Sequence, residues 1–131
     1  MRLAGLVLAA LTLAGCACPW ASSEAGADSS ARAAPLLHLV LFHLEEPADA
    51  PALAADCARL LTTIPTVVSY AAGTHVDIGR DTVVSDYDLA LRVGFDDVEG
   101  YRVYLEHPAH LELLALWKGR LASYEIYDLG H

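Results

Sequence analysis

The segment from Tyr104 to His110 (Tyr-Leu-Glu-His-Pro-Ala-His) places three side chains that can carry or share a proton within seven residues: Tyr104, His107 and His110. Imidazoles titrate near neutral pH, which suits them to proton transfer and to binding polar groups. Proline fixes φ and has no backbone N–H, so Pro108 suits the first position of a helix and leaves His107 at its N-cap. This segment is therefore the first candidate for acid–base chemistry.

The residues after this segment indicate where His110 points. An apolar stripe follows at helical spacing, so His110 should face the core or a cavity in it; the stripe is Leu113, Leu114, Trp117 and Leu121. An inward imidazole needs a hydrogen-bond partner or a ligand. Three roles stay open for His110: a general base, a ligand contact without chemistry, or a core histidine bonded to a backbone carbonyl or to Asp128. For Tyr104 the alternative to a functional role is a half-buried ring without chemistry, and for His107 the alternative to ligand binding is a helix cap.

Other kinds of chemistry lack support in the sequence. His107 and His110 lie three apart beside Glu106, but a tetrahedral metal site needs three or four ligands, and no clear third one is indicated. The sequence has no Gly-x-Gly-x-x-Gly, phosphate loop, Cys-x-x-Cys or Gly-x-Ser-x-Gly motif. We therefore predict no metal and no cofactor.

The charge of the chain argues against one class of partner. The formal net charge is −9 over 131 residues, and no cluster of lysine or arginine exists. Phosphates would be repelled by such a surface, so we predict no nucleic-acid binding.

The N-terminus predicts export and a lipid anchor. Arg2 precedes the apolar run 3–13, which is too short to span a bilayer, so residues 1–15 are interpreted as a signal peptide. Leu13-Ala14-Gly15-Cys16 resembles a bacterial lipobox, which implies a lipidated Cys16. Residues 16–35, rich in Ala, Ser and Gly, would form a flexible tether. We thus expect the protein in the cell envelope, anchored on the periplasmic or extracytoplasmic face of a bacterial membrane.

Hydrophobic periodicity predicts an α+β domain over residues 36–131, with helices covering one face of an antiparallel sheet. Cys57 falls on the apolar face of the first helix and is interpreted as a small buried hydrophobe, although a disulfide with Cys18 stays open. The first expected elements are a strand at 38–44, a helix opened by Asp49 and Pro51 and ended by Pro65, and strands at 66–75 and 87–95. A short helix from about 97, which carries Val98, Tyr101 and Leu105, is then expected to continue across Pro108 into a longer helix that ends near Gly119, and a strand at 123–129 follows.

The opening strand is apolar on both faces, because Leu39 and Leu41 alternate with Val40 and Phe42. Burying a large apolar side chain contributes roughly 1.5–3 kcal/mol, so an uncovered apolar sheet face would be costly. We therefore predict a two-fold homodimer that packs sheet against sheet.

Several segments together resemble one family. They are the strand His38 to Phe42, the helix stop Ile64-Pro65, the strand Tyr87 to Phe95, and the segment Tyr104 to His110. Over about residues 36–129 the sequence is similar to the stress-responsive alpha-beta barrel (Dabb) family. The resemblance implies a ferredoxin-like fold that dimerises into an alpha-beta barrel, and most of this family has no assigned reaction.

One branch of that family, the plant olivetolic acid cyclase type, closes a linear polyketide by aldol condensation. The resemblance gives His110 the role of base and Tyr104 that of holding the substrate. His38 matches another pocket-side histidine and Asp128 an acidic residue of the last strand, whereas Leu89 occupies the position of a histidine often found in the third strand. The predicted ligand-binding set consists of His38, Tyr104, His107, His110 and Asp128.

Three functions follow as hypotheses. The first is a membrane-tethered barrel domain that binds a small apolar or aromatic molecule, because a few polar groups in an apolar lining orient such ligands. The second is a cofactor-independent, polyketide-cyclase-like enzyme with His110 as base. The third is a structural dimerisation module whose interior is filled by side chains.

Overall fold

A computed structural model describes residues 34–130 of the chain. The predicted signal peptide, Cys16, Cys18, nearly all of the predicted tether and His131 lie outside the described residues. The secondary-structure elements are β1 (Leu36–Leu44), the short 3-10 helix η1 (Pro47–Asp49), α1 (Ala50–Leu61), β2 (Ser69–Gly73), β3 (Leu89–Phe95), α2 (Val98–Glu106), α3 (Pro108–Trp117) and β4 (Leu121–Gly130). Within 34–130, no helix combines the length and the apolar character that crossing a membrane requires.

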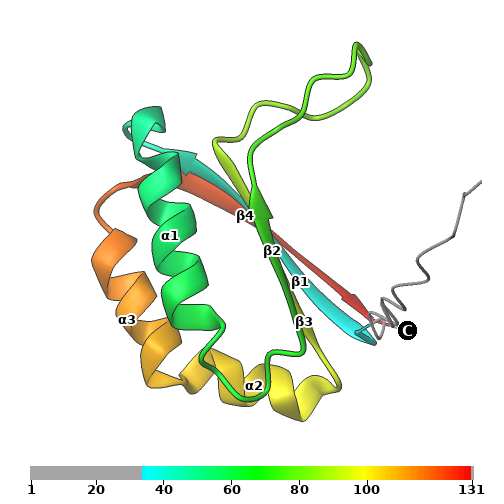
Figure 1. Cartoon of the computed structure of the whole chain (residues 1–131), viewed down its shortest axis with the longest axis vertical. Coiled ribbons are helices and arrows are strands. Elements are labelled where there is room, and N and C mark those ends of the chain that lie inside the picture. Colours follow the sequence, from blue (N-terminus) through cyan, green and yellow to red (C-terminus); the bar gives the residue numbers. More distant parts are fainter. Residues whose placement is uncertain (1–33, 131) are drawn as a thin grey trace, which may run out of the picture. The chain divides into compact units, whose positions relative to one another are not determined.

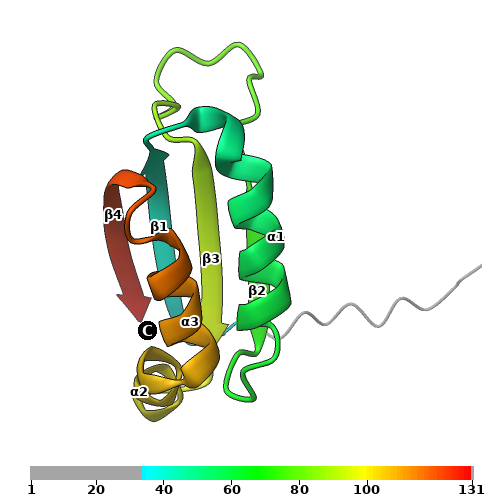
Figure 2. The same ribbon diagram turned by 90° about the vertical axis from the view of Figure 1, so that its left-hand side faces the viewer.

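The four strands form one antiparallel sheet in the order β2-β3-β1-β4. The helices lie on one side of this sheet, with α1 and α3 side by side across it (Figures 1 and 2). This arrangement confirms the α+β, ferredoxin-like fold that the sequence predicted. The helices cover the sheet because each carries one apolar stripe, which must be buried against another element.

Alternation along the strands determines what the helices bury. In β3 every second residue, from Leu89 to Phe95, is at most 2% exposed, and these side chains belong to the core between the sheet and the helices. His38 and Val40 of β1 face the same side. The α1 helix ends at Leu61, earlier than its apolar spacing predicted, yet Ile64 in the following turn is still buried. Cys57 is a buried free thiol in this core.

The helix predicted to run across Pro108 is instead broken into α2 and α3. His107 has extended backbone angles (φ −68°, ψ 137°) and is the N-cap of α3, as the sequence predicted. The helix after it is shorter than expected, and Leu121, predicted as the last residue of its apolar stripe, is the first residue of β4. The reason is that the chain turns after Trp117, where Arg120 N–H donates to the Trp117 carbonyl.

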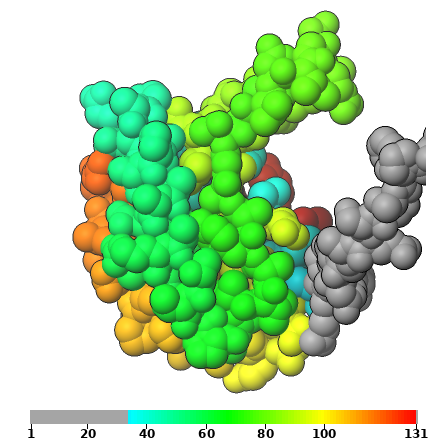
Figure 3. Space-filling view, viewed as in Figure 1, coloured from blue at the N-terminus to red at the C-terminus, as the bar shows by residue number. Residues whose placement is uncertain are grey.

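The side of the sheet away from the helices carries no covering element within residues 34–130. We call this surface the open face. Its apolar members include Tyr127 and Leu129, which are 51% and 54% exposed. The loop 74–88 between β2 and β3 projects beyond the helices and strands (Figures 1 and 3). The open face consists of Leu37, Leu39, Leu41, Ala71, Ala90, Arg92, Glu125, Tyr127 and Leu129.

Candidate functional site

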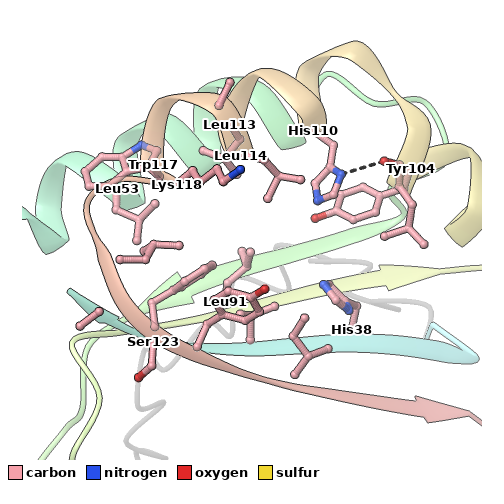
Figure 4. Close-up of a pocket in the computed structure, with 18 of the residues that line it drawn as sticks. His38, Leu53, Leu91, Tyr104, His110, Leu113, Leu114, Trp117, Lys118 and Ser123 are labelled. Carbon is pink, nitrogen blue, oxygen red and sulfur yellow. Dashed lines mark hydrogen bonds between the residues drawn. The ribbon is translucent and has the colours of Figure 1, made fainter. Parts of the chain in front are cut away.

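A cavity of about 620 Å³ lies between the helices and the sheet (Figure 4). Side chains from α1, α2 and α3 and from β1, β3 and β4 line it, and most of them are apolar. Its polar groups gather mainly at one end, which we call the histidine end: His38, Tyr101, Tyr104 and His110. His38 and His110 are 4% and 9% exposed, so both imidazoles face inward as predicted.

Strand register places Asp128 beside His38. The two residues are direct partners in the β1–β4 ladder and therefore point to the same face of the sheet. Asp128 Oδ1 lies 2.7 Å from His38 Nδ1. Because a carboxylate can only accept, this contact assigns the proton to Nδ1 and leaves Nε2 as the acceptor of the neutral ring.

Tyr101 completes this end, and sequence reasoning did not identify it as a site residue. Its hydroxyl lies 2.8 Å from His38 Nδ1 and donates to Asp128 at 3.1 and 3.2 Å. In the sequence Tyr101 was one of several apolar positions on a short helix. The available signal was its spacing from Tyr104, because residues three apart share one face of a helix.

The break between α2 and α3 gives both histidines of the His-Pro-Ala-His segment a defined partner. In an unbroken helix, Ala109 N–H would donate to the Leu105 carbonyl. Here His107 Nδ1 accepts from Ala109 N–H at 3.2 Å, and His110 Nδ1 donates to the Leu105 carbonyl at 3.0 Å. The helix end thus fixes the His110 ring with its Nε2 unprotonated.

Tyr104 lies at the centre of an aromatic cluster and is 1% exposed. Its ring centroid is 4.5 Å from that of His110 and 5.9 Å from that of His38. Phe95 packs against it from β3, with a centroid distance of 5.0 Å. Tyr104 is therefore more buried than the half-buried ring that was its alternative interpretation.

Burial determines the protonation states at this end. It lowers the pKa of His110 below its usual 6.5, with His38 acting in the same direction, although the hydrogen bond to Leu105 opposes them. Burial raises the pKa of Tyr104 far above its usual range, and burial together with Asp128 raises that of Tyr101 to about 12. At neutral pH His110 is thus a neutral acceptor beside a tyrosine that retains its O–H.

The structure brings four of the five predicted ligand-binding residues together and leaves one apart. His38, Tyr104 and His110 line the cavity, and Asp128 contacts His38 from the rim. His107 does not line the cavity, because its ring serves as the cap of α3. Leu89 is buried in the core beneath α1. In residues 34–130, no group of three or more His, Cys, Asp or Glu side chains is arranged to hold a metal ion.

This arrangement offers a hydrogen-bond acceptor and a donor to the same small group. His110 Nε2 can accept a proton or a hydrogen bond, and the Tyr104 hydroxyl can donate to an oxygen. A phenol, a ketone or an enol fits this pair, whereas the apolar remainder of the cavity suits a hydrocarbon body. The same pair has the components for abstracting a proton next to a carbonyl.

Comparisons with known proteins agree with the fold. Residues 36–130 match the model of the Stress responsive A/B Barrel Domain, or Dabb, family. A search of curated proteins found no match.

Solved structures share the fold across most of their length. A dimeric ferredoxin-like protein of unknown function from Thermobifida fusca is 26% identical (TM-score 0.61, 73% of this chain and 90% of that chain). A Dabb family protein from Mesorhizobium loti is 19% identical (TM-score 0.61, 73% of this chain and 95% of that chain). The hydroxynitrile lyase of Passiflora edulis is 14% identical (TM-score 0.63, 73% of this chain and 92% of that chain) and is similar in fold alone. The family match covers nearly all of the described residues, and the chain belongs to the Dabb family.

Proposed function

We propose that this member of the Dabb family binds a small apolar or aromatic molecule in the cavity between its helices and its sheet. The observation that carries the proposal is the cavity of about 620 Å³ with its polar groups gathered mainly at the histidine end. Ligand sites of proteins are commonly about 300–1,000 Å³ and apolar, with a few polar groups that fix the orientation of the ligand.

The cavity argues against the alternative of a filled structural module. Protein interiors are close-packed, and they rarely leave voids much larger than a water molecule. Here a space of ligand size adjoins His38 and His110, both of which have Nδ1 fixed by a protein acceptor. No acceptor or donor within residues 34–130 engages either Nε2, so both remain able to contact a ligand.

A second candidate function is a cofactor-independent enzyme that uses His110 as a base. The fixed tautomer of His110 and its ring contact with Tyr104, at 4.5 Å between centroids, favour it. Proton abstraction by Nε2 next to a substrate carbonyl would leave negative charge on the carbonyl oxygen, which the Tyr104 O–H could stabilise.

We further propose that two copies pack open face to open face. A lone subunit would leave Tyr127, Leu129 and the leucines of β1 in contact with water, and covering them is favourable by roughly 25 cal/mol per Å² of apolar surface. The solved relatives from Thermobifida fusca and Bacteroides fragilis are described as dimeric.

The lipid anchor completes the proposal and rests on sequence alone. Cys16 follows the lipobox-like Leu13-Ala14-Gly15 and an apolar run, and it would hold the domain at a bacterial membrane through its acyl chains. The predicted tether, residues 16–35, would link the anchor to the fold.

A phenol probe tests ligand binding. We expect calorimetry to detect 4-hexylphenol bound to the protein, and His110→Ala to weaken binding about tenfold, because one hydrogen bond of roughly 1–1.5 kcal/mol is lost. Leu111→Ala, on the exposed side of α3, should bind as the wild type does. No binding of this or other small aromatic probes to the wild-type protein would refute the proposal.

Proton exchange tests the enzyme candidate. In deuterated water, NMR should show that the wild-type protein exchanges the α-protons of 4-phenyl-2-butanone, and that His110→Ala slows exchange by about 100-fold or more. The base must be neutral, and the His110 pKa lies below 6.5, so the rate should rise with pH and reach a plateau before neutrality. Equal rates for wild type and His110→Ala would exclude His110 as the base.

Sedimentation tests the dimer. Residues 17–131 should sediment as a dimer at micromolar concentration, and Leu39→Glu should give single subunits, because it puts a charge into the centre of the open face. Leu111→Glu adds the same charge on α3, where the side chain is 51% exposed, and should stay dimeric. A wild-type protein that sediments as a single subunit contradicts the proposal.

Metabolic labelling tests the anchor. Full-length protein made in a bacterial host with radioactive palmitate should carry the label, and Cys16→Ser should lose it because the acceptor thiol is gone. Cys18→Ser is the matched control and should stay labelled. An unlabelled wild-type protein would end this part of the proposal.

A further inference from the structure

The cavity has a second polar feature, formed by Lys118 at the end of α3. Lys118 is the only lysine of the chain. It lines the cavity together with Leu114 and Trp117 of the same helix and with Ser123 of β4. In Figure 4 the Lys118 side chain lies on the cavity side of α3, beside Leu114 and away from the end that holds His38.

The cationic head of Lys118 has no acidic partner in residues 34–130, whereas neighbouring cations do. Arg120 pairs with Asp49 at 2.7 Å, and its guanidinium lies over the Trp117 ring at 3.8 Å. Arg59 pairs with Asp56 and Glu112. The nearby acids on α1 and α3 are therefore engaged by arginine, and the exposed Lys118 side chain at the edge of the cavity pairs with neither of them.

Helix electrostatics explain a cation at this position but not its location at the cavity. A positive side chain is favourable at the C-terminal end of any helix, and it stabilises the helix equally well when it extends into water. The Lys118 side chain is exposed and lines the cavity, so it lies where the cavity meets the solvent. A ligand whose apolar body fills the cavity would exclude water from one side of the ammonium, and the lower local dielectric would strengthen its attraction for an anion. In a chain of net charge −9, Lys118 supplies a positive partner for an organic anion at this cavity.

The spacing along α3 defines the size of the ligand. His110 and Lys118 are eight positions apart, which corresponds to about 12 Å along the helix axis. Between them, Leu113 and Leu114 line the cavity from α3, and Ile126 lines it from β4. A molecule that meets both polar groups must be elongated, with an apolar body.

We propose that the cavity takes an elongated carboxylic acid, whose carboxylate pairs with Lys118 while its apolar body extends toward His38 and His110. This inference rests on the proposed ligand binding and specifies the ligand class. Lys118 selects an acid over a neutral analogue, and the histidine end receives any hydroxyl or carbonyl at the far end of the molecule.

Octanoate and 1-octanol form a matched pair of probes that differ in charge. At pH 8, calorimetry on the full chain in detergent should show octanoate binding about tenfold more tightly than 1-octanol. Lys118→Met should abolish this preference with little change in the affinity for 1-octanol, and Lys118→Arg should keep it. Arg102→Met is the control, since it removes the same charge from an exposed position on α2, and it should behave as the wild type.

The possible results distinguish a failure of the elongated-acid inference from a failure of the proposed ligand binding. If octanoate and 1-octanol bind equally, or if Lys118→Met retains the preference, Lys118 does not select the ligand, although the cavity still binds one. If neither octyl probe binds while 4-hexylphenol does, the elongated-acid class is wrong. If no probe binds, the proposed function fails along with this inference.

Discussion

The site depends on one constraint: a buried imidazole needs a hydrogen-bond partner, and strand register supplies that partner. His38 lies in β1 among apolar neighbours at 4% exposure, and an unpaired polar group there would be costly. The β1–β4 ladder sets Asp128 directly opposite, so the pairing that builds the sheet also satisfies Nδ1. A slip of one residue would turn Asp128 to the open face and remove the carboxylate partner of His38. The fold and the histidine end are thus specified by the same register.

The break between α2 and α3 applies the same logic to His110. A helix end leaves backbone groups without intrahelical partners, and Pro108 guarantees such an end because it cannot donate. His107 takes the free N–H of Ala109, and His110 takes the free carbonyl of Leu105. A structural necessity therefore fixes a ring that also faces the cavity. The same hydrogen bond therefore satisfies the Leu105 carbonyl and orients the His110 ring.

The two sides of the sheet divide the physical roles of the domain. The helix side combines a close-packed core under α1 with a cavity at β1, β4 and α3, whose polar groups lie at the histidine end and at Lys118. The open face is mostly apolar, and this suits a second protein surface. The proposed ligand site and the proposed dimer surface therefore use opposite faces of the same strands.

Local pattern was sufficient for the order of the elements, the faces of the strands, the N-cap at His107 and the inward direction of His110, since these depend on residues within one or two turns of each other. It failed for Leu121, whose helical spacing continued past the point at which the chain turns into β4. Only the tertiary structure decided that Tyr101 meets His38 and Asp128, which are 63 and 27 positions away in sequence, and that Lys118 lines the cavity. Periodicity determines which face a side chain occupies, whereas strand register and the angle at the helix break determine which faces meet.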